Sequence, residues 1–247
     1  MAFDPDLAKL TVDLAKLAYR DADSARSGAA SHGLDQFRFF DGETSTQAFT
    51  ATDANRRFLS FRGTESNNPR DWVVDSRFKP RPAALGSVHS GFDGALDEVW
   101  EEVLEEIGED VRPLVITGHS LGGGLATLAA ARLADTGSPP AAVYVYGCPR
   151  TGLAGFRDGY DATLRDVTFR IINHIDIVTR VPLLIQGYRA PGQRMYFDRN
   201  GGFHPDAGAW QIAKDDLVYR LTNFKSIKAL GLGTHEMGAY VDRVAAL

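Results

Sequence analysis

The pattern Gly-x-Ser-x-Gly at Gly118, Ser120 and Gly122 places one hydroxyl between two glycines. The apolar run Pro113–Thr117 comes before it, and Leu125–Leu133, whose composition favours helix, comes after it. A strand that turns sharply into a helix lifts a serine clear of the backbone at the expense of local strain. Such a turn leaves no room for Cβ atoms two residues on either side, which explains the glycines. The spacing predicts a nucleophilic serine at position 120.

A serine hydroxyl is a poor nucleophile at neutral pH and needs a histidine to take its proton. His235 follows Gly231-Leu232-Gly233-Thr234 and opens the predicted last helix, so a loop can deliver its ring to a site. We therefore predict His235 as the general base. His204 is the second candidate, and His174 and His89 follow it. His119 adjoins the serine in the turn, and we expect its side chain to point away.

The histidine in turn needs a carboxylate that fixes its tautomer and balances its charge. Sites in open α/β sheets gather at the carboxyl ends of the strands. Asp176 lies a few residues after the predicted strand Val167–Ile172, and we predict it as the acid. The competing carboxylates are Asp161, Asp198 and Asp206. The resulting chain order of serine, aspartate and histidine is the order used on α/β-hydrolase sheets.

A tetrahedral intermediate on the serine would need hydrogen-bond donors aimed at its oxyanion. The backbone N–H of Leu121, directly after the nucleophile and at the start of the helix, is the first candidate. Thr64 follows Gly63 at the end of an earlier predicted strand and can add a backbone N–H and a hydroxyl. We predict an oxyanion hole made of Leu121 and Thr64.

The elements that must position these residues follow an α/β pattern. Leucines at three- and four-residue spacing predict a first helix from Asp4-Pro5 to about Tyr19. Helices are also expected over about 93–107 and 235–246, and strands over Gln36–Phe40, Gln47–Thr52, Arg57–Phe61 and Ala142–Tyr146. The first three strands suggest an antiparallel part of the sheet. Alternating strands and helices from 113 to 175 predict a mostly parallel sheet with helices on both faces. Residues 21–34 and 183–230 are expected to be irregular, and no linker divides residues 1–247, so we predict a single domain.

Composition excludes several classes of protein. The chain has 247 residues, 44% hydrophobic and 24% charged, with a net charge of −5, which is typical of globular proteins and unlike a nucleic-acid binder. Its one cysteine, Cys148, cannot form an intrachain disulfide or a cysteine-based metal site. Neither a signal peptide nor a transmembrane segment is predicted. From these features we predict a cytoplasmic protein, with secretion by another route left open.

Seven stretches together resemble the class 3 lipases, the fungal-lipase-like branch of the α/β hydrolases. They are FRGT (61–64), DWVVD (71–75), VHSGF (88–92), GHSLGG (118–123), YGCPRTG (146–152), NHIDIVTRVP (173–182) and the H-x4-Y pair His235 and Tyr240. They occur in the family's order over about 180 residues, which is more specific than any one motif.

The resemblance implies the α/β-hydrolase fold, with roles for individual residues. It implies Ser120 as nucleophile, Asp176 as acid, His235 as base, and Thr64 and Leu121 as the oxyanion hole. It further implies that Asp75 holds the threonine hydroxyl, that Tyr19 lines the same pocket, and that Trp72 belongs to a lid. The stretch 65–74 is more polar than the lid of secreted fungal members.

These assignments predict a carboxylic ester hydrolase that works through an acyl-enzyme, with no cofactor and no metal. The favoured activity is that of an acylglycerol lipase, and the alternatives in the same chemistry are a phospholipase A1-type enzyme and a short-chain esterase. Acyltransferase, peptidase and a catalytically inactive hydrolase fold used as a binding module are alternatives from other classes. The expected partners are a lipid or small-molecule ester and, transiently, a lipid surface.

Overall fold

A computed structural model describes residues 2–44, 46–63, 79–108, 110–205, 207–222 and 233–247. Its central sheet is formed by β1 (Asp35–Asp41), β2 (Gln47–Thr52), β3 (Arg57–Phe61), β6 (Leu114–His119), β7 (Ala142–Tyr146), β9 (Thr168–Asn173), β11 (Gln193–Phe197) and β12 (Phe203–Pro205). Within the described residues the order is β1-β2-β3-β6-β7-β9-β11-β12. Strands β3, β6, β7, β9 and β11 are parallel, and antiparallel strands flank them at both edges. The predicted mostly parallel sheet with an antiparallel part is confirmed.

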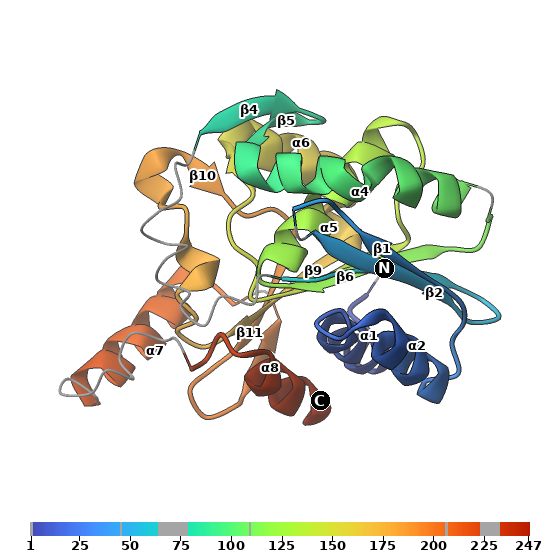
Figure 1. The fold of residues 1–247 in the computed structure, drawn as a ribbon. Helices are drawn as coiled ribbons and strands as arrows, with labels where there is room; N and C mark the ends of the chain where they lie inside the picture. Colours follow the sequence, from blue (N-terminus) through green and yellow to red (C-terminus); the bar gives the residue numbers. More distant parts are fainter. Residues whose placement is uncertain (1, 45, 64–78, 109, 206, 223–232) are drawn as a thin grey trace.

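Helices cover both faces of this sheet (Figure 1). One layer contains α4 (Ser90–Gly108), α5 (Leu121–Asp135) and α6 (Ala154–Leu164), and the other contains α1 (Pro5–Leu17), α2 (Ala22–Ser31) and α8 (Met237–Ala245). Each layer buries its own apolar core against the sheet. Helix α7 (Ala209–Thr222) is drawn at the left of Figure 1. None of the described helices combines the length and apolar character that spanning a membrane requires.

A second, smaller sheet was not predicted. It contains β4 (Pro80–Ala83), β5 (Gly86–His89), β8 (Gly152–Leu153) and β10 (Tyr188–Arg189), in the order β10-β8-β5-β4 among the described residues. Two of these strands have only two residues, so no local pattern could mark them. This sheet ties the segment after β7 to the segment before α4.

The expectation of a loop at 21–34 is wrong, because α2 occupies most of it. Asp21 caps the helix by accepting a hydrogen bond from the backbone N–H of Ser24. A Cβ atom on Gly28 would lie 2.3 Å from Cδ2 of Leu17, so a larger residue there would require the Leu17 side chain to move. The small residues that suggested a loop serve close helix packing.

The expectation of an irregular segment at 183–230 is also wrong for much of its length. Strand β11 extends the parallel sheet by pairing with β9, with Met195 opposite Ile171. Strand β12 then pairs with β11, and α7 follows. Because the partner of β11 lies some twenty residues earlier in the chain, only tertiary pairing identifies it as a strand. Residues 223–232 lie outside the described part.

Candidate active site

Ser120 occupies the turn between β6 and α5. Its φ of 57° and ψ of −125° lie where residues other than glycine are rarely found. Such a conformation costs roughly 1–3 kcal/mol and persists only when its surroundings hold it. Here the backbone N–H of Ser120 donates to the carbonyl of Tyr146 at 2.9 Å, and its own carbonyl accepts from Gly123 N at 3.0 Å. The predicted strained turn is confirmed.

The two glycines around Ser120 are required by close backbone contacts. A Cβ atom on Gly118 would lie 2.3 Å from the carbonyl oxygen of Gly122. A Cβ atom on Gly122 would lie 2.2 Å from the carbonyl oxygen of Phe61, in β3. Since both obstacles are backbone, neither can move aside as a flexible side chain would. The steric reason given above for the glycine spacing therefore holds.

The structure brings Ser120, His235 and Asp176 together, although 56 and 59 residues separate them along the chain. Ser120 Oγ lies 2.8 Å from His235 Nε2, and His235 Nδ1 lies 2.9 Å from Asp176 Oδ2. A carboxylate only accepts, so Nδ1 bears the proton and Nε2 is left to accept from the serine hydroxyl. The side chain of Asp176 is fully buried and that of His235 is 8% exposed.

Asp176 is held by donors besides His235. The backbone N–H of Val178 donates to Oδ1 at 2.9 Å, and the Tyr240 hydroxyl donates to Oδ2 at 2.6 Å. The Thr179 hydroxyl donates to the backbone carbonyl of Asp176 at 2.8 Å and fixes the loop. A buried carboxylate without such donors would be costly. We refer to residues 174–182 below as the acid loop.

Gly147, at the end of β7, was not singled out from the sequence. Its φ is +57°, and a Cβ atom there would lie 2.9 Å from Asp176 Oδ2 and 3.0 Å from His235 Nδ1. Any side chain at this position would push apart the atoms of that hydrogen bond. The YGCPRTG motif contained the signal, but the requirement for glycine becomes visible only once the three segments are placed together.

His119 lies closer to the site than expected. Its ring stacks on that of His235, with centroids 4.7 Å apart and planes 28° apart. Its Nε2 donates to the carbonyl of His235 at 2.7 Å, so Nδ1 accepts from the Tyr19 hydroxyl at 2.8 Å. Burial, followed by repulsion from His235, lowers the pKa of His119 well below its usual value. His119 is therefore a neutral support that fixes the backbone of His235.

Of the other predicted site residues, two lie within the described ranges and three lie outside them. Leu121 is the first residue of α5, where a backbone N–H has no acceptor within its own helix. The Tyr19 hydroxyl lies beside Gly63, because a Cβ atom there would be 2.1 Å from it. Thr64, Trp72 and Asp75 lie outside the described residues. The roles proposed for all five residues stay predictions.

The competing histidines and aspartates have partners elsewhere. His204 Nε2 lies 2.8 Å from Asp198 Oδ2, and His174 Nδ1 lies 2.9 Å from Asp215 Oδ2. His89 Nδ1 accepts from backbone N–H groups at the start of α4, and Asp161 Oδ1 accepts from Gly192 N. Asp206 lies outside the described residues. Within the described ranges, no three His, Cys, Asp or Glu side chains are grouped so that they could hold a metal ion.

Comparison with known proteins identifies the family. The family described as Lipase (class 3) matches residues 58–186, just over half of the chain. This chain belongs to the class 3 lipase family. The matched segment contains Ser120 and Asp176 and ends before His235.

Curated relatives and solved structures agree with this assignment. The secreted mono- and diacylglycerol lipase 1 of Fusarium solani is 33% identical over 63% of this chain and 49% of its own length. The secreted mono- and diacylglycerol lipase A of Penicillium cyclopium is 34% identical over 59% and 50%. A crystal structure of a mutant of the protein MDLA from the same organism superposes with a TM-score of 0.72 at 26% identity, over 83% of this chain and 86% of that one. The chain spans about half the length of the curated relatives it matches, and the α/β-hydrolase fold is confirmed.

The prediction of a cytoplasmic location is wrong by these comparisons. The relatives from Fusarium solani, Penicillium cyclopium and Penicillium camembertii are all named as secreted lipases. Their names point to an extracellular rather than a cytoplasmic location. The prediction depended on the chain's first residues and on its cysteine count, and neither feature separates the two locations.

Proposed function

We propose that this protein is a serine carboxylic ester hydrolase in which Ser120, His235 and Asp176 act together. The observation that supports this most strongly is the hydrogen-bonded series of Asp176 Oδ2, His235 and Ser120 Oγ at a strained turn, with separations of 2.9 and 2.8 Å. Strain and burial of this kind are expected where a nucleophile and its base are held ready.

In the proposed reaction, Ser120 Oγ attacks the ester carbonyl while His235 Nε2 takes the hydroxyl proton. The carbonyl oxygen becomes an oxyanion, which the backbone N–H of Leu121 and the N–H and hydroxyl of Thr64 would stabilise. The C–O bond to the alcohol breaks as His235 returns the proton to the leaving oxygen. A water molecule then loses a proton to His235, attacks the acyl-enzyme and releases the acid and free Ser120.

Asp176 would stabilise the positive imidazolium that forms twice in each cycle. Its carboxylate accepts from His235 Nδ1–H and is itself held by Val178 N and the Tyr240 hydroxyl. These donors keep the carboxylate oriented, so little reorganisation is needed when the charge appears. His119 adds a second constraint through the carbonyl of His235.

We propose acylglycerols as substrates, because two relatives are named mono- and diacylglycerol lipases. A phospholipase A1 activity is the second candidate, since phospholipase A1-IIdelta of Arabidopsis thaliana is 36% identical over 36% of this chain. The proposal includes contact with a lipid surface outside the cell. We also propose that residues 1–247 act as a single catalytic domain, with Asp75 and Tyr19 supporting the oxyanion hole and Trp72 in a lid.

Replacing the nucleophile tests the reaction directly. We expect Ser120→Ala to lower kcat for p-nitrophenyl esters by about a thousandfold or more, because the acyl-enzyme cannot form. Ser27→Ala, in the exposed part of α2, is the matched control and should retain full activity. Retention of more than about a thousandth of wild-type kcat in Ser120→Ala would contradict the assignment.

Two further measurements separate the alternatives. An organophosphonate probe should label Ser120 in the wild-type protein and leave Ser120→Ala unlabelled, whereas an inactive binding module would stay unlabelled in both. Product analysis with water and an alcohol in competition distinguishes hydrolysis from acyl transfer. A panel of acylglycerols and phospholipids of different chain lengths then ranks the two substrate classes.

A further inference from the structure

A cavity of about 390 Å³ lies between Arg157 of α6 and the strands β9 and β11. The acid loop forms part of its wall through His174, Thr179 and Arg180, so the cavity lies next to the loop that holds Asp176. Its described lining includes no aspartate or glutamate but six arginines: Arg150, Arg157, Arg170, Arg180, Arg189 and Arg194. We call this cavity the arginine pocket.

Arg170 is the most unusual of these side chains. It lies in β9 and is only 6% exposed, although arginine is seldom this buried without a paired carboxylate. Its Nε donates to the carbonyl of Pro191 at 3.3 Å. Within the described ranges, its two terminal nitrogens have no acceptor. The cation is therefore fixed by the strand and left with unused donors at the cavity.

Arg150 likewise has no carboxylate within ion-pair distance among the described residues. Its Nη1 donates to the backbone carbonyls of Arg180 and Pro182, and no described carboxylate pairs with it. Burial, followed by repulsion from Arg189, Arg180 and Arg194, lowers the pKa of Arg150 to about 10. Burial, followed by repulsion from Arg194, likewise lowers the pKa of Arg170 to about 10. Neighbouring guanidinium groups thus destabilise one another across the pocket.

The arginines of the pocket differ in whether their guanidinium groups already have a partner. Arg157 pairs with Asp158 at 2.6 Å, and Arg180 and Arg194 have further contacts of their own. Arg189 is partly exposed, and its Nη1 donates to the backbone carbonyls of Leu184 and Tyr188 at 3.0 and 2.9 Å. Three cations therefore lack a described carboxylate partner: Arg150, Arg170 and Arg189.

We propose that the arginine pocket binds a phosphate-type oxyanion through Arg150, Arg170 and Arg189. A phosphate group offers several acceptor oxygens that match the planar fork of a guanidinium, and its charge would relieve the repulsion among the three cations. The cavity is in the size range of small-molecule sites and exceeds a bare phosphate ion, so a phosphate ester fits better. This site is separate from Ser120 and its function does not depend on ester hydrolysis.

Such a phosphate could belong to a soluble ester or to a lipid headgroup. Leu184 lines the pocket and is 53% exposed, and the adjacent Leu183 and Ile185 are 52% and 91% exposed. Exposed aliphatic side chains beside a cationic cavity suit a lipid surface with anionic headgroups. The experiment below therefore has one arm for each source.

The first arm is calorimetric titration of the wild-type protein with inorganic phosphate and with glycerol 3-phosphate, against chloride at equal ionic strength. We expect a dissociation constant of about 1 mM or tighter at low salt. Arg170→Gln should weaken binding by about tenfold or more, because a charge-assisted hydrogen bond is lost. Arg189→Gln, at a partly exposed position that folding tolerates better, should weaken it by roughly threefold to tenfold. Arg38→Gln, at the opposite end of the sheet, should leave it unchanged.

The second arm measures binding of Ser120→Ala to phosphatidylcholine vesicles with and without phosphatidic acid, so that no lipid is hydrolysed. Binding that requires phosphatidic acid and is lost with Arg189→Gln supports a lipid headgroup as the ligand. Binding of glycerol 3-phosphate without vesicle binding supports a soluble ester. If neither ligand binds, or if Arg170→Gln and Arg189→Gln both bind as tightly as wild type, the proposal is overturned. None of these measurements uses turnover, so the outcome is independent of the esterase assay.

Discussion

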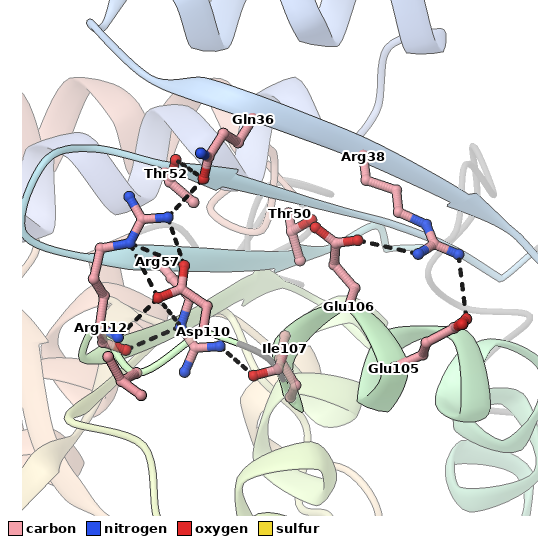
Figure 2. A pocket seen from close by; sticks show the side chains of 11 residues that line it. Gln36, Arg38, Thr50, Thr52, Arg57, Glu105, Glu106, Ile107, Asp110 and Arg112 are labelled. Carbon is pink, nitrogen blue, oxygen red and sulfur yellow. Dashed lines mark hydrogen bonds and ion pairs between the residues drawn. The ribbon is translucent and has the colours of Figure 1, made fainter.

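Two arginine-lined cavities at opposite ends of the central sheet differ in whether carboxylates balance their arginines. The arginine pocket lies beside the acid loop. The second cavity, of about 510 Å³, lies where β3 and β6 begin and is shown in Figure 2; we call it the paired pocket. Its cations face carboxylates within 4 Å: Arg38 faces Glu105 and Glu106, Arg57 faces Asp110, and Arg112 faces Asp110. The three arginines and three carboxylates of Figure 2 thus balance one another in total, and they join β1, β3 and the end of α4.

The difference separates an end of the sheet where charges are paired from an end where unfavourable interactions gather. In the paired pocket, Arg112 is the main cause that lowers the pKa of Asp110 to about 2, so the pair favours the folded state. In the arginine pocket the cations repel one another, and at the nearby turn Ser120 is strained. Both features oppose folding. Backbone strain and unpaired charges are concentrated at sites that bind ligands or carry out reactions.

A similar comparison can be made between two histidine–aspartate pairs, one buried and one partly exposed. His235 with Asp176 and His204 with Asp198 have nearly equal separations, 2.9 and 2.8 Å, but only the first pair reaches a serine hydroxyl. We expect Asp176→Asn to lower kcat by about 10³–10⁴, since the amide no longer fixes the tautomer of His235. Asp198→Asn is the matched control, and it should leave kcat unchanged.

Steady-state kinetics with a soluble ester, alongside the thermal midpoints of both variants, checks this prediction. A comparable loss of kcat in both variants would mean that the two pairs act through stability alone. Full activity in Asp176→Asn would remove the acid from the proposed mechanism.

Much of the parallel sheet could be predicted because its signals are local. The apolar runs of β6, β7 and β9 alternate with helices. The glycines around Ser120 indicate a tight turn within a few residues. The two-residue strands β8 and β10, and β11, depend on partners far along the chain. No periodicity within those segments could show them.

The residues of the candidate site also separate into those with local sequence signals and those whose roles depend on distant segments. Ser120, Asp176 and His235 could be proposed because chemistry dictates the residue types and the sheet dictates where they gather. His119 was expected to point away, yet it supports His235 through its backbone carbonyl. That role depends on a contact across 116 positions, which the order of residues does not reveal. Gly147 was missed for the same reason, because its constraint comes from two other segments.

Tyr240→Phe tests the difference between the His235–Asp176 pair and a histidine–aspartate pair outside the candidate site, and a smaller effect is expected. The Tyr240 hydroxyl donates to Asp176 Oδ2 at 2.6 Å, and in a matching arrangement the Tyr196 hydroxyl donates to Asp215 Oδ2 at 2.5 Å beside His174. We expect Tyr240→Phe to lower kcat about tenfold with little change in KM, because the carboxylate is less firmly oriented toward His235. Tyr196→Phe should leave kcat unchanged. Equal losses of kcat in both variants would show that neither hydroxyl acts specifically on the reaction.

The smallest effect is expected in the paired pocket, and it depends on pH. The pKa of Asp110 is lowered from 3.8 to about 2, so its ionised form favours the folded state above pH 4, and this contribution is lost as the pH falls toward 2. After allowance for its partial exposure to solvent, Asp110→Asn should lower the free energy of unfolding by about 1 kcal/mol at pH 7 and by almost nothing at pH 2. Urea unfolding of both proteins across this range measures the difference, and kcat for ester hydrolysis at pH 7 should stay the same. A loss of stability that persists at pH 2 would assign the effect to packing, and a loss of kcat would mean that the two ends of the sheet are coupled.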